Sequence, residues 1–247
     1  MTIEFLTVAE GTIAYQRQIG DAHKPGIIFL CGYASDMARS KACFLAQKCV
    51  EENINFIRFD YSGCGQSKGN FADGTIGRWC EDSLTVLDQL TEGPQILVGS
   101  SMGGWMGLLM AQKRATRIKA FIGIAAAPDF TEELVWKQLT DKRRKILLRD
   151  GEIYDDDAPS DHQVPMTLKL IEEARNHLVL RTVMKITCPV RLLQGKKDTE
   201  VPWSYAQRIA DHIANIDTRI TLIENGDHFL STEENLRLLW QTIAEFL

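Results

Sequence analysis

Hydrophobic and polar positions follow two rhythms along the chain, one typical of strands and one of helices. Residues 2–8 and 12–18 alternate apolar with polar side chains around Glu10 and Gly11, which predicts an antiparallel hairpin. Short apolar runs predict buried strands at 26–31, 55–60, 95–98, 118–125, 189–193 and 219–223. Apolar residues spaced three and four apart predict helices at 40–52, 75–91, 105–115, about 203–214 and 232–246.

This alternation of strand and helix predicts an α/β fold built on one mostly parallel sheet. Parallel neighbours need crossover connections, and right-handed crossovers place helices on both faces of the sheet. A length of 247 residues fits one large domain with an insertion.

The alternation stops between Pro128 and Lys185, where we expect helical pieces around 131–149 and 165–177 but no strand. We interpret residues 128–185 as a small helical cap over the sheet's C-terminal edge, and an ordinary pair of crossover helices is the alternative. The core domain then comprises the remaining residues, 1–127 and 186–247. Within the cap, the basic run 142–145 is interpreted as a solvated helix face, and the acidic run 155–157 as a loop.

Charge and composition exclude several classes of protein. The net charge is −5 with both signs interspersed, so nothing resembles the basic stripe of a nucleic-acid-binding protein. The apolar runs are too short to span a membrane, for which about 18 residues are needed. The six cysteines form no C-x-x-C pair and are expected to be buried and reduced. With no secretory signal recognisable at the N-terminus, these thiols favour a cytoplasmic location.

The most informative motif is Gly99-Ser100-Ser101-Met102-Gly103. It follows a predicted strand and opens a predicted helix, which is the context of a nucleophile elbow of the G-x-S-x-G type. Ser101 has glycine two residues away on both sides, whereas Ser100 has Val98 at that position. Ser101 is therefore the predicted nucleophile.

A serine nucleophile needs a histidine base and a carboxylate to orient it, here in the chain order Ser, Asp, His. Asp198 and His228 each follow a late predicted strand, so both belong at the same sheet edge as Ser101. Asp129 is the rival acid, and Asp227 is adjacent to the histidine but expected to point away. Asp60 is interpreted as a residue that braces a loop. The other histidines are interpreted as surface, packing or cap residues: His23, His162, His177 and His212.

Two backbone N–H groups are expected to bind the oxyanion of the tetrahedral intermediate. One belongs to Met102 at the start of a helix, and the other to Tyr33, which follows Gly32 after the strand at 26–31. Candidates for the substrate pocket are Met37, Trp105 and, from the cap, Trp136. Cys31 lies near this site but lacks an elbow of its own.

With these residues in place, the chain resembles the α/β-hydrolase superfamily over nearly its full length. Segments 59–67, 93–105 and 189–203 are similar to the subgroup of mitochondrial palmitoyl-protein thioesterases that also cleave acyl glucuronides. The resemblance implies a serine esterase or thioesterase with Ser101 as nucleophile, Asp198 as acid and His228 as base. The chain starts almost at its first strand, without a mitochondrial presequence, which matches the expected cytoplasmic location.

We therefore predict a hydrolase of carboxylic esters or thioesters that needs neither cofactor nor metal. Its substrate is a small molecule or an acylated protein, and its oligomeric state is not readable from the sequence. Three alternatives use the same residues: an acyltransferase, a peptidase, or an enzyme that hydrolyses carbon–carbon bonds. A fourth is a non-catalytic ligand-binding protein that retains the fold.

Overall fold

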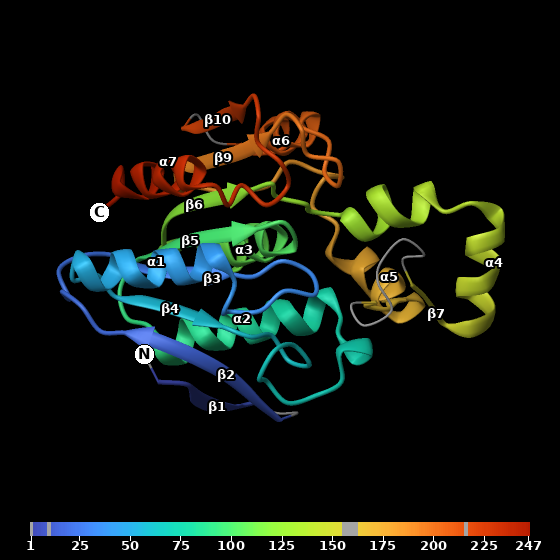
Figure 1. Cartoon of the computed structure of the whole chain (residues 1–247), viewed down its shortest axis with the longest axis horizontal. Helices are drawn as coiled ribbons and strands as arrows, with labels where there is room; N and C mark the ends of the chain where they lie inside the picture. The colour runs from blue at the N-terminus through green and yellow to red at the C-terminus, as the bar shows by residue number, and fades with distance from the viewer. Residues whose placement is uncertain (1, 9–10, 155–162, 215–216) are drawn as a thin grey trace.

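An eight-stranded sheet forms the centre of the molecule (Figure 1). The computed structural model describes residues 2–8, 11–154, 163–214 and 217–247. The strand order is β1-β2-β4-β3-β5-β6-β9-β10, and all pairs are parallel except β1–β2 and β2–β4. The strands are β1 (Glu4–Val8), β2 (Gly11–Gln18), β3 (Gly26–Leu30), β4 (Phe56–Phe59), β5 (Gln95–Ser100), β6 (Ile118–Ile124), β9 (Val190–Gly195) and β10 (Thr218–Ile223). The predicted mostly parallel sheet is confirmed.

Helices cover both faces of this sheet. In Figure 1, α1 and α7 lie together on one face, and α2 and α3 pack against each other on the opposite face. Every residue of β3, β5 and β9 is buried between these layers, which explains their continuous apolar runs. The core helices are α1 (Ser40–Glu51), α2 (Ile76–Leu90), α3 (Met102–Lys113), α6 (Ser204–Asp211) and α7 (Glu233–Ala244), with short 3-10 turns η1 (Phe71–Asp73) and η2 (Ala115–Arg117).

The segment 128–185 lies beyond the C-terminal ends of the parallel strands (Figure 1). Its elements are the π-helical turn η3 (Thr131–Val135), the 3-10 turns η4 (Trp136–Gln138) and η5 (Arg175–His177), the helices α4 (Asp141–Asp150) and α5 (Leu168–Ala174), and the strands β7 (Glu152–Ile153) and β8 (Met166–Thr167). The acidic run 155–157 and His162 lie outside the described residues, as does Glu10 of the N-terminal hairpin.

Two expectations for this segment were wrong. The stretch 131–149 is not one helix, because the chain is extended at Leu139 and Thr140 and the Thr140 side chain caps a new helix by accepting from Arg143 N–H. The segment also contains a strand pair, β7–β8. Gly151 ends α4 in the left-handed conformation at φ 82°, which turns the chain into β7. Two-residue strands are too short to produce an alternating pattern in the sequence.

Candidate active site

Ser101 sits in a strained turn between β5 and α3. Its backbone angles are φ 54° and ψ −118°, a region that side chains other than glycine seldom occupy. The turn is fixed by main-chain bonds: Ser101 N–H donates to Ile124 O at 2.9 Å, and Ser101 O accepts from Gly104 and Ala127 at 2.8 and 3.1 Å. A nucleophile elbow has this strained conformation, which exposes the hydroxyl above the strand ends.

The glycines of the motif permit the tight turn because neither position has space for a side chain. A Cβ at Gly103 would lie 2.1 Å from the carbonyl oxygen of Leu30, and one at Gly99 would lie 2.2 Å from that of Gly103. Strand and helix therefore cross at a separation that only glycine allows.

Asp198 and His228 are directly hydrogen-bonded. Asp198 Oδ2 lies 2.9 Å from His228 Nδ1, and the Asp198 side chain is fully buried. Asp198 follows β9 and His228 follows β10, so the parallel pairing of these two strands brings together residues that are 30 positions apart.

The surroundings of Asp198 favour its charged form. Burial alone would raise the pKa of this carboxyl, but hydrogen bonds from His228 and from the Val201 and Glu200 amides outweigh burial and lower the pKa below 3.8. Gln194 Nε2 donates a further bond at 2.9 Å. Asp198 is therefore a rigid, ionised acceptor for the imidazole at neutral pH.

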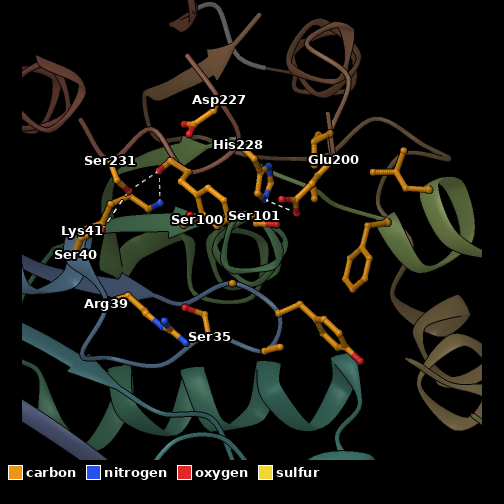
Figure 2. A pocket seen from close by; sticks show the side chains of 18 of the residues that line it. Ser35, Arg39, Ser40, Lys41, Ser100, Ser101, Glu200, Asp227, His228 and Ser231 are labelled. Carbon is orange, nitrogen blue, oxygen red and sulfur yellow. Dashed lines mark hydrogen bonds and ion pairs between the residues drawn. The ribbon is translucent and has the colours of Figure 1, made fainter. Parts of the chain in front are cut away.

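Ser101 and His228 line the same cavity, which has a volume of about 1120 Å³. Figure 2 shows Ser101 beside the His228 ring, with Arg39, Ser40, Lys41 and Ser231 grouped on one side. The apolar part of the lining includes Tyr33, Ala127, Phe130, Leu134, Val135 and Val201. One part of the lining is thus an apolar wall, to which the 128–185 segment contributes. The other part, here called the polar arm, consists of Arg39, Ser40, Lys41 and Ser231.

The second ring nitrogen of His228 faces Glu200. Figure 2 marks the contact of its Nε2 with Glu200 Oε2 by a dashed line. The two atoms are 3.4 Å apart, and more than half of the Glu200 side chain is exposed. Within the described ranges, no hydrogen bond joins Ser101 Oγ to His228. The structure therefore places Ser101 and His228 on one cavity and joins Asp198 to His228 by a hydrogen bond.

The two expected oxyanion donors belong to residues near Ser101. Met102 is the first residue of α3, and Tyr33 follows Gly32, whose position is close enough that a Cβ there would lie 3.4 Å from Ser101 Cβ. Within the described part of the chain, neither amide N–H donates a hydrogen bond. Tyr33 also lines the cavity, and the assignment of both amides to the oxyanion site stays a prediction.

The alternative acids have other partners. The buried Asp129 carboxylate accepts from the Val179 and Leu180 amides at 2.8 and 3.0 Å, and burial raises its pKa. Asp227 accepts from Leu230 N–H at 2.8 Å, and Asp60 accepts from the amides of Met37 and Gln66.

Neither the remaining described histidines nor Cys31 lines the cavity that contains Ser101. His23 lies near the opposite sheet edge, His177 pairs with Glu173 at 2.6 Å, and His212 contacts Arg208 O at 2.8 Å. Burial raises the pKa of the Cys31 thiol well above its ordinary value, so this cysteine stays protonated.

The three predicted pocket side chains lie outside the cavity lining. Met37 is buried, and Trp105 is fully buried and donates to His177 O at 3.0 Å. Trp136 stacks against the guanidinium groups of Arg144 and Arg175. The apolar lining comes instead from residues just before Trp136, together with Phe229. Leu134 and Val135 were missed because they lie in η3, a π-helical turn that does not follow the α-helical periodicity used to predict it.

The family follows from comparison with known proteins. The family model for the alpha/beta hydrolase fold matches residues 27–166. The mitochondrial palmitoyl-protein thioesterase ABHD10 of Mus musculus is 38% identical over 247 residues, which cover 100% of this chain and 82% of that protein. The Homo sapiens counterpart is 37% identical and is covered to 76%. The chain belongs to the α/β-hydrolase family. It is a hydrolase of that fold, as its sequence resemblance predicted.

Solved structures agree with this assignment. The mouse ABHD10 structure superimposes with a TM-score of 0.90 at 39% identity, covering 99% of this chain and 98% of that one. A putative hydrolase from Agrobacterium vitis S4 gives a TM-score of 0.93 at 34% identity, covering 100% and 99%. Est1E from Butyrivibrio proteoclasticus, solved with ferulic acid bound, shares the fold at 21% identity, with a TM-score of 0.81 and coverage of 98% and 97%.

The expected cytoplasmic location is contradicted by the relatives. Five proteins that are 35–38% identical are named mitochondrial. All six cysteines are free in the structure, but reduced thiols fit any reducing compartment and did not distinguish between locations.

The described residues offer neither a metal-binding cluster nor a membrane-spanning helix. No group of three or more His, Cys, Asp or Glu side chains is arranged to hold a metal ion within those ranges. No helix among them has the length and apolar character needed to cross a bilayer.

Proposed function

We propose that this hydrolase cleaves acyl thioesters and carboxylic esters through an acyl-enzyme on Ser101. The observation that carries the proposal is the Asp198–His228 hydrogen bond, whose histidine lines the same cavity as a serine in the strained elbow conformation. A buried carboxylate on Nδ1 selects the tautomer whose Nε2 can accept a proton.

In the first half of the proposed reaction, Ser101 Oγ attacks the acyl carbonyl while His228 Nε2 takes the hydroxyl proton. Negative charge moves to the carbonyl oxygen, which accepts bonds from the N–H groups of Tyr33 and Met102. The helix dipole of α3 stabilises the same charge because Met102 is its first residue. Substrate entry displaces the exposed Glu200 carboxylate from Nε2.

In the second half, the intermediate collapses and His228 gives its proton to the departing thiol or alcohol. A water molecule then attacks the acyl-enzyme, with His228 again acting as base, and releases the free acid. Asp198 remains ionised throughout and stabilises the imidazolium.

The cavity supports an apolar acyl group as substrate. Its apolar wall, which includes Phe130, Leu134 and Val135, suits a hydrocarbon chain, and the polar arm suits the leaving group. The mouse and human relatives are named palmitoyl-protein thioesterases, which is consistent with this division. We extend the proposal to residues 128–185, which would act as a cap that supplies this wall.

A matched set of substrates tests the proposal. One series of oxygen esters would share a single alcohol leaving group, and one series of thioesters would share a single thiol leaving group. Both series, with increasing acyl length, would be assayed on the wild type and on Ser101→Ala. We expect kcat/KM to rise by about fourfold per added methylene until the wall is filled, since each buried methylene contributes about 0.8 kcal/mol. Ser101→Ala should lose activity by about 10³-fold or more.

Ser83→Ala serves as the matched control, because Ser83 is buried in α2, where it bonds to Trp79 O and to the Tyr61 side chain, and does not line the cavity. Full activity of Ser101→Ala would refute the proposed nucleophile. Rates independent of acyl length would refute the proposed acyl wall. Products carrying an added amine or alcohol in place of free acid would point to acyl transfer.

A further inference from the structure

Lys41 is a buried lysine in the wall of the active-site cavity. It lies in the first turn of α1 and is only 9% exposed. Lysine is seldom buried without a partner, and a cation near a helix N-terminus opposes the helix dipole. Burial and the helix dipole both disfavour a charged lysine at this position, so the contacts that compensate for them indicate what Lys41 does.

Lys41 Nζ donates to the carbonyl oxygen of Phe229, the residue after His228 (Figure 2). The neighbouring residue makes a parallel contact, since Ser40 Oγ lies 3.2 Å from Ser231 Oγ. Ser231 Oγ also donates to Phe229 O at 3.1 Å. The first turn of α1 is therefore hydrogen-bonded, through two side chains, to the loop immediately after His228.

The same loop is fixed on the other side of the histidine. Lys197 N–H, from the turn after β9, donates to Gly226 O at 2.9 Å. His228 thus lies between an anchor at residue 226 and an anchor at residue 229. The Asp198 bond sets the rotation of the ring, whereas the two anchors set the position of its backbone.

We propose that Lys41 is a positioning residue for His228, which it holds in reach of Ser101 through the carbonyl of Phe229. This role rests on the proposed function, in which His228 is the base.

The charge of Lys41 gives this role a pH dependence. Burial lowers the pKa of Lys41 to about 8, although Asp227 and Cys31 act in the opposite direction. Arg39, the remaining charged group nearby on the same turn, is exposed and pairs with Asp36 at 3.4 Å. Above this pKa the ammonium becomes a neutral amine, and the charge-assisted bond to Phe229 O loses about half its strength.

The test is the pH dependence of kcat and KM for an oxygen ester between about pH 6 and pH 10. Lys41→Met, Lys41→Arg and the wild type would be compared, with Lys48→Met as control. Lys48 lies on the same helix but is partly exposed and pairs with Glu51 at 2.7 Å.

For the wild type we expect kcat to decline above about pH 8, where Lys41 loses its proton. Lys41→Met should lower kcat at neutral pH by roughly tenfold to a hundredfold with little change in KM, and should not show the alkaline decline. Lys41→Arg retains its charge and should stay active at high pH. Lys48→Met should match the wild type.

A wild-type kcat that stays constant up to pH 10 would overturn the inference, and this measurement needs no variant to fold. Wild-type kcat in a folded Lys41→Met would overturn it as well. Failure of the proposed function is a separate result, because Ser101→Ala would then be as active as the wild type.

Discussion

At Ser101 the backbone adopts a conformation that few residues other than glycine tolerate. Main-chain hydrogen bonds to Ile124, Gly104 and Ala127 hold Ser101 in this conformation. The absence of side chains at Gly99 and Gly103 leaves space for the turn. The strain is therefore supported by the surrounding structure and presents the hydroxyl to the cavity.

Asp198 is predicted to control the tautomer of His228. Asp198→Asn keeps the size of the side chain but places an N–H₂ or a neutral oxygen against Nδ1, so kcat should fall by about 10⁴-fold. Steady-state ester hydrolysis measures this loss. The control is Asp88→Asn, which alters only an exposed pair with Arg114. An Asp198→Asn enzyme within tenfold of the wild type would contradict the assigned role.

The residues of the site differ in how visible they are in the sequence. Ser101, Asp198 and His228 each follow a strand, and the ends of parallel strands meet at one edge, so their meeting could be predicted. Lys41 could not, because its partner Phe229 is 188 positions away and no motif links the two. Glu200 carried no signal beyond its position two residues after Asp198.

At the scale of elements, the Asp129 carboxylate joins the chain that leaves β6 to the chain that returns to the core near the end of the 128–185 segment. Asp129 adopts φ 59° after β6 and accepts from the Val179 and Leu180 amides. This carboxylate ties together the two ends of the 128–185 segment. Because the two amides occupy both of its oxygens, we expect a structural role for Asp129, although its place after a strand made it a rival for the catalytic acid.

Asp129→Ala should therefore destabilise the protein without removing its chemistry. Two buried amides would lose their acceptor, which costs about 2–6 kcal/mol in the free energy of unfolding. Urea denaturation measures the loss, and kcat per folded molecule should stay within about tenfold of wild type. A fully stable but inactive Asp129→Ala would instead assign the acid role to Asp129.

The elements of the core were more predictable than those of the 128–185 segment. Strands such as β5 and β9 are buried on both faces and read as continuous apolar runs. In the 128–185 segment, a π-helical turn, a 3-10 turn and two-residue strands follow one another. Such short elements are set by tertiary contacts, and their local pattern does not identify them.

At the scale of the whole molecule, the carboxylate of Glu133 links the 128–185 segment to the core. Glu133 pairs with Lys137 and Arg181 in the same segment and with Arg208 on α6 at 3.3 Å. Burial alone would raise the pKa of Glu133, but the three cations lower it to about 2. The ionised group therefore favours the folded state.

The sign of its pH dependence follows from these values. The pKa of a glutamate in the unfolded chain is about 4.3, so the contribution of Glu133 is fully present above that pH. It is lost as the pH falls towards about 2. Glu133→Gln should lower the unfolding free energy at neutral pH, and the difference from wild type should shrink below about pH 4.

Urea denaturation of both proteins at several pH values checks this expectation. Glu224→Gln is the control, since Glu224 is exposed and pairs only with Lys196 across two surface turns. A difference between wild type and Glu133→Gln that does not change with pH would show that the network is not electrostatic.

Covalent labelling of Ser101 tests the proposed mechanism most directly. The wild type would be treated with a fluorophosphonate, and the modified residue located by peptide mass spectrometry. We expect one adduct, on Ser101, formed rapidly by the wild type, much more slowly by Asp198→Asn and not at all by Ser101→Ala. An adduct on Ser100 or another side chain, or ester hydrolysis that continues while Ser101 remains unmodified, would contradict the assignment of the nucleophile.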